Sequence, residues 1–299
     1  EGSFTAAAKK LFVSQPALSA TVKKAETELG VRLFDRRSNP LRLTEEGRAY
    51  IQAVEKMYRV RQDFENDITD VSSLRTGSVK VGGAHFISSF VLPNMIIAFA
   101  KEYPHVTIEM LESDSAHLQQ RLDAEELELM VDYDFEKQQY CAFPLLREHL
   151  LLAIPTAMTV CLPAAELLDA AAVCADEHLR ADAPQFPLDA VADLPFVLLK
   201  KGNDMYARSM AVCGEAGFSP HCTLYLDQLV TAYNMARAGM GAAFVTDTLV
   251  KAAPCGAELR FLRLGGNHAE RTLYIAHKRH RYISRAVREF IRIATELYR

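Results

Sequence analysis

A short stretch near the start of the chain carries side chains that could read DNA. Gln15 and Ser19 lie in the first turns of a segment with helical periodicity, and amide and hydroxyl groups suit the hydrogen-bonding edges of bases. The basic residues around them, which could neutralise phosphates, are Lys9, Lys23, Lys24, Arg36, Arg37 and Arg42. The pattern indicates DNA binding, but an ordinary solvated face on a small helical domain explains the periodicity equally well.

Further along the chain, polar groups stand in loops where strands are expected to end and helices to begin. Unpaired N–H groups at helix starts favour carboxylates or other anions, and side chains in the same loops add hydrogen bonds. The residues expected to bind a small molecule are Ala84, His85, Ser88, Ser89, Gly202, Asn203 and Thr246. A plainer interpretation is that either serine merely caps a helix and that His85 is an ordinary loop residue.

The six cysteines are scattered, and no two are separated by only two residues. This spacing argues against a zinc site and against a CxxC redox pair, so we expect no metal and no cofactor. Most of the cysteines are expected to be reduced and structural. Cys213 and Cys222 leave a thiol-based redox sensor open as an alternative, although nothing basic and specific lies close to lower a thiol pKa.

Motifs for catalysis are missing from the sequence. It contains no GxSxG elbow, no HExxH and no phosphate-binding glycine-rich loop. Gly239 and Gly241 resemble part of a dinucleotide fingerprint, but they follow an expected helix and precede an expected strand, the reverse of the order which that site needs. We therefore expect no enzyme. A small-molecule-binding or enzymatic α/β domain without a regulatory role remains the alternative from another class.

Two short helices must position the base-reading residues. Residues 3–12 form an amphipathic pattern, and residues 14–29 form a second one. Ser14 is the expected N-cap of the second helix, Pro16 is tolerated in its first turn, and Gly30 ends it. Two helices joined by a tight turn are typical of a helix-turn-helix. The outward side of the second helix carries Gln15, Ser19, Thr21 and Lys23.

A long helix is expected from Thr44 to about Leu74. Thr44 can cap it, and the two glutamates that follow complement the positive end of its dipole. Apolar residues recur along it every three or four positions or at multiples of that spacing, and these are Val54, Met57, Phe64, Ile68 and Val71. So narrow a stripe suits a seam between two helices better than a globular core, which favours dimerisation over packing within one chain.

Beyond residue 77, strands alternate with helices. Expected strands cover residues 79–83, 106–112, 127–133, 196–199, 223–226, 242–246, 259–264 and 272–277. Expected helices cover residues 88–103, 116–124, 204–216, 228–238 and 284–298. The alternation predicts a doubly wound parallel sheet with helices on both faces. Two such runs give two lobes joined by two crossovers, with the ligand loops in the cleft between them.

Four blocks at the start of the chain resemble, in order and spacing, the DNA-binding domain of LysR-type transcriptional regulators. They are SFTAAAKKLF (residues 3–12), SQPALS (14–19), LGVRLFDR (29–36) and LTEEG (43–47). The resemblance implies a winged helix-turn-helix whose residues facing the major groove are Ser14, Gln15, Pro16 and Ser19. It also implies a β-wing over residues 31–43, in which Arg36 or Arg37 contacts the minor groove or a phosphate. Ala20 departs from the family pattern, which usually has a larger polar or basic residue there.

The resemblance implies an α/β protein of three parts. Residues 1–48 form a winged helix-turn-helix, with a further helix normally ahead of residue 3, and residues 44–76 form a linker and dimerisation helix. Residues 77–299 form a two-lobed effector-binding domain similar to periplasmic binding proteins. Lobe I covers about residues 77–158 and 256–299, and lobe II about residues 159–255. The expected function is transcription regulation by a homodimer or homotetramer that binds double-stranded DNA and a small-molecule effector, with a carboxylate or another anion favoured.

Composition and charge agree with this interpretation. Hydrophobic residues make up 49% and charged residues 24% of the chain, as in globular proteins. Residues 1–76 carry 13 basic and 11 acidic side chains, against a net charge of −4 for the whole chain. The longest apolar run is interrupted by prolines and is too short to span a bilayer, and no basic, then apolar leader is present. We therefore expect a cytoplasmic protein without a membrane partner, and not an exported transport protein.

One stretch departs from the family pattern. Residues 156–187 contain an alanine-rich segment and an acidic, proline-containing run, and they are longer than the corresponding part of relatives. We expect this stretch at the crossover between lobes or as an extra helix on lobe II. The sequence offers no functional interpretation of it.

Overall fold

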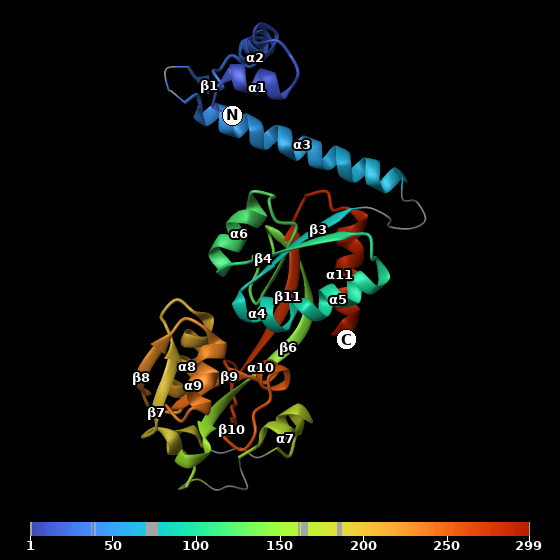
Figure 1. Ribbon diagram of the computed structural model, residues 1–299. Coiled ribbons are helices and arrows are strands. Elements are labelled where there is room, and N and C mark those ends of the chain that lie inside the picture. Colours follow the sequence, from blue (N-terminus) through green and yellow to red (C-terminus); the bar gives the residue numbers. More distant parts are fainter. Residues whose placement is uncertain are drawn as a thin grey trace. The chain divides into compact units, whose positions relative to one another are not determined.

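The computed structural model describes residues 2–36, 38, 40–69, 77–160, 162, 167–183 and 187–298. The chain forms two compact units, Glu1–Val71 and Ser72–Arg299, and each unit has a fold of its own (Figure 1). Among the described residues, no helix combines the length and the apolar character that a membrane crossing requires.

The first unit begins with two short helices, α1 (Phe4–Lys10) and α2 (Gln15–Leu29). Ser3 caps α1 and Ser14 caps α2, because each hydroxyl accepts a backbone N–H from the first helical turn, at 3.2 Å and 3.3 Å. Gly30 has a φ of 71° and ends α2 in the left-handed conformation. The structure thus agrees with the predicted cap and stop of α2, whereas α1 is shorter at both ends than the pattern suggested.

A small two-stranded wing follows, in which β1 (Phe34–Asp35) pairs antiparallel with β2 (Arg42–Leu43). Glu26 on α2 holds its base, since the carboxylate accepts the backbone N–H groups of Leu33 and Phe34 at 2.9 Å and 3.3 Å. Gly47 lies so close to this turn that a Cβ there would stand 2.0 Å from the Leu33 carbonyl oxygen. A glycine is therefore required where the wing meets the next helix.

That helix, α3, covers Glu45–Thr69. Thr44 caps it, as predicted, by accepting the Gly47 N–H at 2.9 Å. Large apolar side chains on it are exposed to solvent, namely Tyr50, Ile51, Val54, Met57, Tyr58, Val60 and Phe64. The predicted continuation to Leu74, the Ile68 side chain and Val71 lie outside the described residues.

The second unit is an α/β domain of two lobes. The first lobe has a parallel sheet in the order β4-β3-β5. Its strands are β3 (Ser78–Gly83), β4 (Thr107–Glu112) and β5 (Leu129–Asp132). Its helices are α4 (His85–Phe90), α5 (Leu92–Glu102), α6 (Ser115–Asp123) and α11 (Arg285–Leu297). The last of these returns from the end of the chain, and its Phe290 packs on Phe99 of α5 with ring centroids 5.2 Å apart.

The predicted helix over residues 88–103 is in fact two helices. The first, α4, already begins at His85. The helix is interrupted at Val91, which has φ −105° and ψ −55° and separates α4 from α5. Pro93 lies in the first turn of α5. Because proline lacks an N–H and its ring collides with the preceding turn, a continuous helix through this position is disfavoured.

The second lobe repeats the pattern around a parallel sheet in the order β9-β7-β8. Its strands are β7 (Pro195–Leu199), β8 (His221–Leu226) and β9 (Ala242–Thr246). Its helices are α8 (Asp204–Glu215), α9 (Leu229–Arg237) and α10 (Asp247–Ala252). The short helix α10 was not expected from the sequence, which predicted a strand over residues 242–246 and no element directly after it.

Two long strands cross between the lobes. They are β6 (Tyr140–Pro155) and β11 (Glu270–Lys278), which pair antiparallel with each other (Figure 1). The second half of β6 also pairs with β9 and with β10 (Leu259–Arg263), again antiparallel. The expectation of a wholly parallel sheet is therefore corrected: the sheet is mixed. The two expected crossovers are present, although β6 itself was missed.

The stretch that departs from the family pattern does form an extra helix. This is α7 (Ala170–Cys174), which packs against α10 and β10 of the second lobe. Leu168 joins the stretch to β10 through reciprocal backbone hydrogen bonds with Phe261, both of 2.8 Å. A 3-10 turn, η3 (Glu177–Leu179), then carries the side chain of His178 into the interior, where it is 1% exposed.

Candidate functional site

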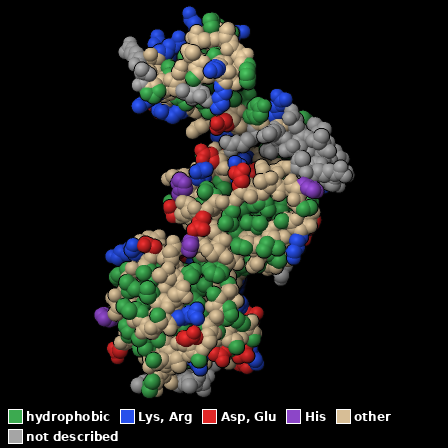
Figure 2. Space-filling model, viewed as in Figure 1, with side chains coloured by type: hydrophobic (Ala, Val, Ile, Leu, Met, Phe, Trp, Pro, Cys, Tyr) green, Lys and Arg blue, Asp and Glu red, His purple; other side chains and the backbone are tan. Residues whose placement is uncertain are grey.

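The first candidate site is the exposed side of α2. Gln15 and Pro16 are exposed at its start, Lys23 is exposed about two turns later, and Ser19 is half-buried between them. Basic side chains are spread over the visible surface of this unit (Figure 2). The helix start therefore offers an amide and positive charges together, which is what base reading with phosphate neutralisation requires.

Two of the hydroxyls predicted to face DNA are occupied within the helix. Ser14 accepts the Ala17 N–H as the N-cap, and Thr21 donates to the Ala17 carbonyl at 3.0 Å. Both side chains are exposed, but their hydrogen bonds hold α2 together. Gln15 and Lys23 remain the side chains of this helix best placed to contact a partner.

The wing arginine is anchored to the unit. Arg36 donates to Glu26 at 3.0 Å and lies over the ring of Phe4, 5.9 Å from its centroid. Burial raises the pKa of Glu26, but the two backbone donors and Arg36 outweigh it and hold that pKa below its usual range. Arg36 thus fastens the wing to α2 as well as presenting charge. Arg37, the other predicted wing contact, lies outside the described residues.

The second candidate site is a cleft between the two lobes. It has a volume of about 590 Å³ and is lined by the ends of strands and the starts of helices from both lobes. Four of the seven predicted ligand residues line it: Ala84, His85, Gly202 and Asn203. Volume and position are those of a small-molecule site.

The other three predicted residues do not line this cleft. Ser88 is buried and donates to the Gly83 carbonyl at 2.9 Å. Thr246 is fully buried and caps α10 by accepting the Leu249 N–H at 3.3 Å. Ser89 lies on the exposed side of α4. Sequence position did not reveal that the hydroxyls of Ser88 and Thr246 bond to the backbone.

Carboxylates dominate the charge of the cleft. Five of its lining residues are acidic: Glu112, Asp114, Asp132, Asp204 and Asp227. Burial raises the pKa of Asp132, and hydrogen bonds from Ser115 and the Tyr133 N–H offset part of that effect. An ionised group costs much less in such a place when a positive charge lies beside it.

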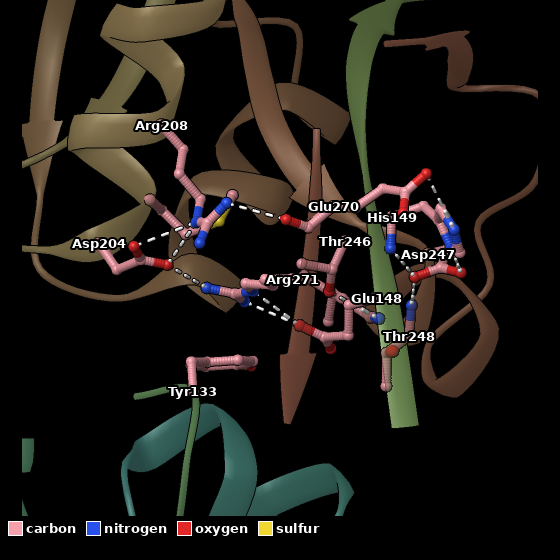
Figure 3. A network of polar contacts seen from close by, with 12 residues as sticks. Tyr133, Glu148, His149, Asp204, Arg208, Thr246, Asp247, Thr248, Glu270 and Arg271 are labelled. Atoms are coloured by element: carbon pink, nitrogen blue, oxygen red, sulfur yellow. Dashed lines mark hydrogen bonds and ion pairs between the residues drawn. The ribbon is translucent and has the colours of Figure 1, made fainter. Parts of the chain in front are cut away.

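Arg271, on the crossover strand β11, is a cation of the cleft that is already neutralised. It donates to the fully buried Glu148 at 2.9 Å and to Asp204 at 3.0 Å, and its guanidinium lies 3.6 Å from the ring centroid of Tyr133 (Figure 3). Tyr133 follows β5 of the first lobe and Asp204 opens α8 of the second. Arg271 therefore bridges both lobes at the floor of the cleft.

A second ion pair of the cleft, which contains a histidine, is also internal to the protein. His85 lies 2.6 Å from Glu112, from Nδ1 to Oε1. Sequence reasoning found His85 because it follows a strand directly, but it missed Glu112, Asp132 and Arg271. Both acids stand at the ends of predicted strands, so the sequence could have placed them at the edge of the sheet. Arg271 lies inside a strand, and no local sequence pattern marks it.

A winged helix-turn-helix and a two-lobed α/β domain with a polar cleft, in one chain, define the class of DNA-binding proteins that respond to a ligand. Residues 1–48 match the family model described as bacterial regulatory helix-turn-helix protein, lysR family, and residues 72–299 match LysR substrate binding domain. The chain belongs to the LysR family of transcriptional regulators, as its sequence blocks implied.

Sequence relatives and solved structures agree with this family assignment. The chain is 28% identical over 295 residues to the uncharacterized HTH-type transcriptional regulator YcgK of Bacillus subtilis, covering 98% of this chain and 90% of that one. It is 39% identical over 110 residues, 37% of this chain and 32% of the other, to a probable RuBisCO transcriptional regulator of Synechocystis.

Full-length OxyR from Pseudomonas aeruginosa has a similar fold, with a TM-score of 0.62 and 21% identity over 98% of this chain and 88% of that one. Full-length CbnR in complex with its target DNA gives a TM-score of 0.58 and 17% identity over 100% and 95%. Members of the family are DNA-binding regulators and not enzymes, which removes the enzymatic alternative.

Proposed function

We propose that this regulator reads its operator with the start of α2 and with the wing, and that a small-molecule effector in the interlobe cleft changes that binding. The observation that carries the proposal is the cavity of about 590 Å³, lined by both lobes, in a chain that also has a helix-turn-helix. A ligand that contacts both lobes shifts the population between more open and more closed arrangements. The regulator would act in the cytoplasm, where its DNA is.

The proposed domain bounds follow the same division of labour. Residues 1–48 would bind DNA, residues 44–76 would link and dimerise, and residues 77–299 would bind the effector, with lobes at about 77–158 plus 256–299 and about 159–255. The exposed apolar residues of α3 support a seam between two chains. We propose a homodimer or homotetramer, in which two DNA-binding domains together bind an operator of two half-sites.

For the effector, the helix starts around the cleft favoured a carboxylate or another anion. The charges of the cleft favour an effector that carries a positive group. Arg271 is already neutralised by Glu148 and Asp204, and His85 faces Glu112. Asp132 also lines the cleft, and Arg271, whose charge acts on it, is bonded to those other two carboxylates. We propose an effector that presents an amine toward Asp132. A carboxylate on the same molecule would bind the unpaired backbone N–H groups at the helix starts that line the cleft.

The DNA part of the proposal is tested by fluorescence anisotropy with the region upstream of its own gene and with random DNA, at several salt concentrations. Exchanging Gln15 for Ala should weaken binding to the cognate site by about tenfold, since one good base contact is worth about 1–3 kcal/mol, and change random-DNA binding little. Losing Lys23 should weaken both and flatten the salt dependence. Equal losses on both DNAs for Gln15→Ala would contradict base reading by this residue.

The effector part is tested by the melting temperature of the full chain with putrescine, γ-aminobutyrate and succinate, which have the same length and different charges. The amine-bearing compounds should raise the melting temperature, and Asp132→Asn should remove that effect. Asp182→Asn, an exposed acid outside the cleft, is the matched control. Stabilisation by succinate alone would favour the anion instead.

A further inference from the structure

Three side chains from distant parts of the second unit meet at the crossover strand β6, on the face opposite to the effector cleft. Glu148 and His149 are consecutive on β6, so their side chains point to opposite faces of the sheet. Glu148 faces Arg271 and the cleft, whereas His149 faces Asp247, the first residue of α10 (Figure 3). His178 completes the group from the extra stretch of the second lobe.

The geometry of this group matches a metal coordination shell. Nδ1 of His149 lies 3.4 Å and Nε2 of His178 lies 3.1 Å from the same oxygen, Oδ2 of Asp247. In tetrahedral zinc sites, with ligands at about 2.0–2.2 Å from the ion, neighbouring ligand atoms are about 3.3–3.5 Å apart. All three ligand atoms lie within 4.8 Å of one another, so a modest approach of the two imidazoles would bring three protein ligands to one ion.

The carboxylate of Asp247 is held ready for such a role. Its other oxygen, Oδ1, accepts the backbone N–H groups of His149 and Thr248, both at 2.9 Å. These bonds fix the plane of the carboxylate and leave Oδ2 to face the imidazoles, as outer contacts do in metal sites.

Hydrogen bonding alone accounts poorly for the placement of His178. The residue is 1% exposed, and its Nδ1 is buried without a hydrogen-bond partner among the described residues. An unsatisfied buried polar atom destabilises the folded state. An apolar side chain would fill the same position without that cost. The imidazole is therefore better explained if it also binds a ligand.

The group is accessible to an ion. His149 and His178 line a cavity of about 390 Å³ that is separate from the effector cleft and also contains Arg147, Arg263 and Glu270. The His149 side chain is 22% exposed, so an ion and a fourth ligand, water or an anion, can reach the position. A competing cation is present, because Lys251 Nζ lies 3.4 Å from Asp247 Oδ2, although it also binds Asp176 at 2.6 Å.

We propose that His149, His178 and Asp247 form a binding site for a divalent transition metal of the zinc type, separate from the effector cleft. Imidazole and carboxylate ligands suit such ions. The metal would join the extra stretch of the second lobe to the crossover strand and to α10. It would give that stretch, which the regulator function leaves unexplained, a role as the carrier of one ligand.

The test uses the full chain, stripped of metal with a chelator and then titrated with Zn²⁺ by calorimetry and with Co²⁺ by visible absorption. One equivalent of Zn²⁺ should bind, and Co²⁺ should give the intense visible bands of a tetrahedral site. His178→Gln and His149→Gln should each weaken Zn²⁺ binding at least tenfold. His221→Gln, at an exposed position on β8, should bind Zn²⁺ like the parent.

A fourth variant separates coordination from folding. Lys251→Met should tighten Zn²⁺ binding several-fold, because it removes the cation that competes for Asp247, while any loss of fold would weaken binding. His149→Gln covers the case in which His178→Gln unfolds, because His149 is partly exposed. Absence of Zn²⁺ binding to the folded parent, or equal binding by the two histidine variants and the parent, would overturn the proposal. The readout involves neither DNA nor effector, so it is independent of the proposed function.

Discussion

At the scale of the residue, Arg271 shows how a single charge organises the effector domain. Its side chain is 4% exposed and pairs with Oε2 of the fully buried Glu148, while it touches a residue from each lobe. Removing one partner of such a pair leaves an uncompensated buried charge. The arginine therefore supports the fold and at the same time sets the charge of the cleft.

We expect Arg271→Met to destabilise the second unit by about 3–5 kcal/mol, because Glu148 stays buried without a partner. Arg147→Met is the matched control: this arginine is largely exposed and pairs with Glu270 at 3.4 Å, and such surface pairs contribute about 1 kcal/mol or less. Urea denaturation followed by circular dichroism measures both. Similar midpoints for the two variants would show that the buried pair has no special weight.

Cys213 provides a second residue-scale prediction, directed at the redox alternative. The thiol is fully buried, and burial raises its pKa to about 12, so at neutral pH it is a protonated and unreactive group. In the native protein, iodoacetamide should modify exposed Cys174 long before Cys213, and in urea it should modify both. Mass spectrometry of the peptides gives the two rates. Equal native rates would revive the redox sensor.

Sequence reasoning at this scale recovered what local position can reveal. Ser14, Gly30 and Thr44 were predicted because caps and stops depend on near neighbours. Arg271, Glu148 and the His149 group escaped it, because their partners lie far away along the chain and only the folded sheet brings them together.

At the scale of the element, the wing is held by one carboxylate. Glu26 joins α2 to β1 through two backbone hydrogen bonds and one ion pair. Hydrogen bonds to a charged group contribute about 1.5–3 kcal/mol each. The orientation of the wing relative to the reading helix therefore depends on the ionised state of this side chain.

Glu26→Gln should increase amide hydrogen exchange at Leu33 and Phe34 by about tenfold, while Glu28→Gln, exposed on the same helix and 3.9 Å from Lys24, should leave it unchanged. The pKa of Glu26 is lowered in the folded state, so the stabilisation is complete above its unfolded pKa of about 4.3 and is lost as pH falls through the folded value. Exchange measured by NMR across this range should show protection in the parent fading with acid. A flat profile would mean that Glu26 does not hold the wing.

Most elements of the effector domain were visible in the sequence, and the exceptions have physical causes. The break before Pro93 was hidden because apolar periodicity continues across it. Strand β6 was missed because its second half is buried on both faces and therefore does not alternate. Helix α10 is only one and a half turns long and follows a strand directly, with no loop to mark the change.

At the scale of the whole molecule, α3 has an apolar side that the single chain leaves in solvent. Met57 is 72% and Phe64 59% exposed, which is unusual for large apolar side chains in such a row. If the same helix of a second copy packed against it, the apolar rows of both chains would be covered, as in a two-fold symmetric dimer.

We expect Met57→Lys to shift the full chain toward monomers, because a charge in the seam would be buried without a partner. Gln52→Lys introduces the same charge on the opposite side of α3 and should leave the assembly unchanged. Light scattering coupled to size-exclusion chromatography gives the mass of each variant. Unchanged mass for Met57→Lys would place the interface elsewhere.

The consecutive placement of Glu148 and His149 on β6 has a thermodynamic consequence. One segment of backbone supports the floor of the effector cleft on one face and the proposed metal ligands on the other. If occupancy of one face changes the twist of the strand, the two ligands are linked, and linkage is reciprocal. The factor by which Zn²⁺ alters effector affinity must then equal the factor by which the effector alters Zn²⁺ affinity, so cellular metal supply would set the sensitivity of the genetic response.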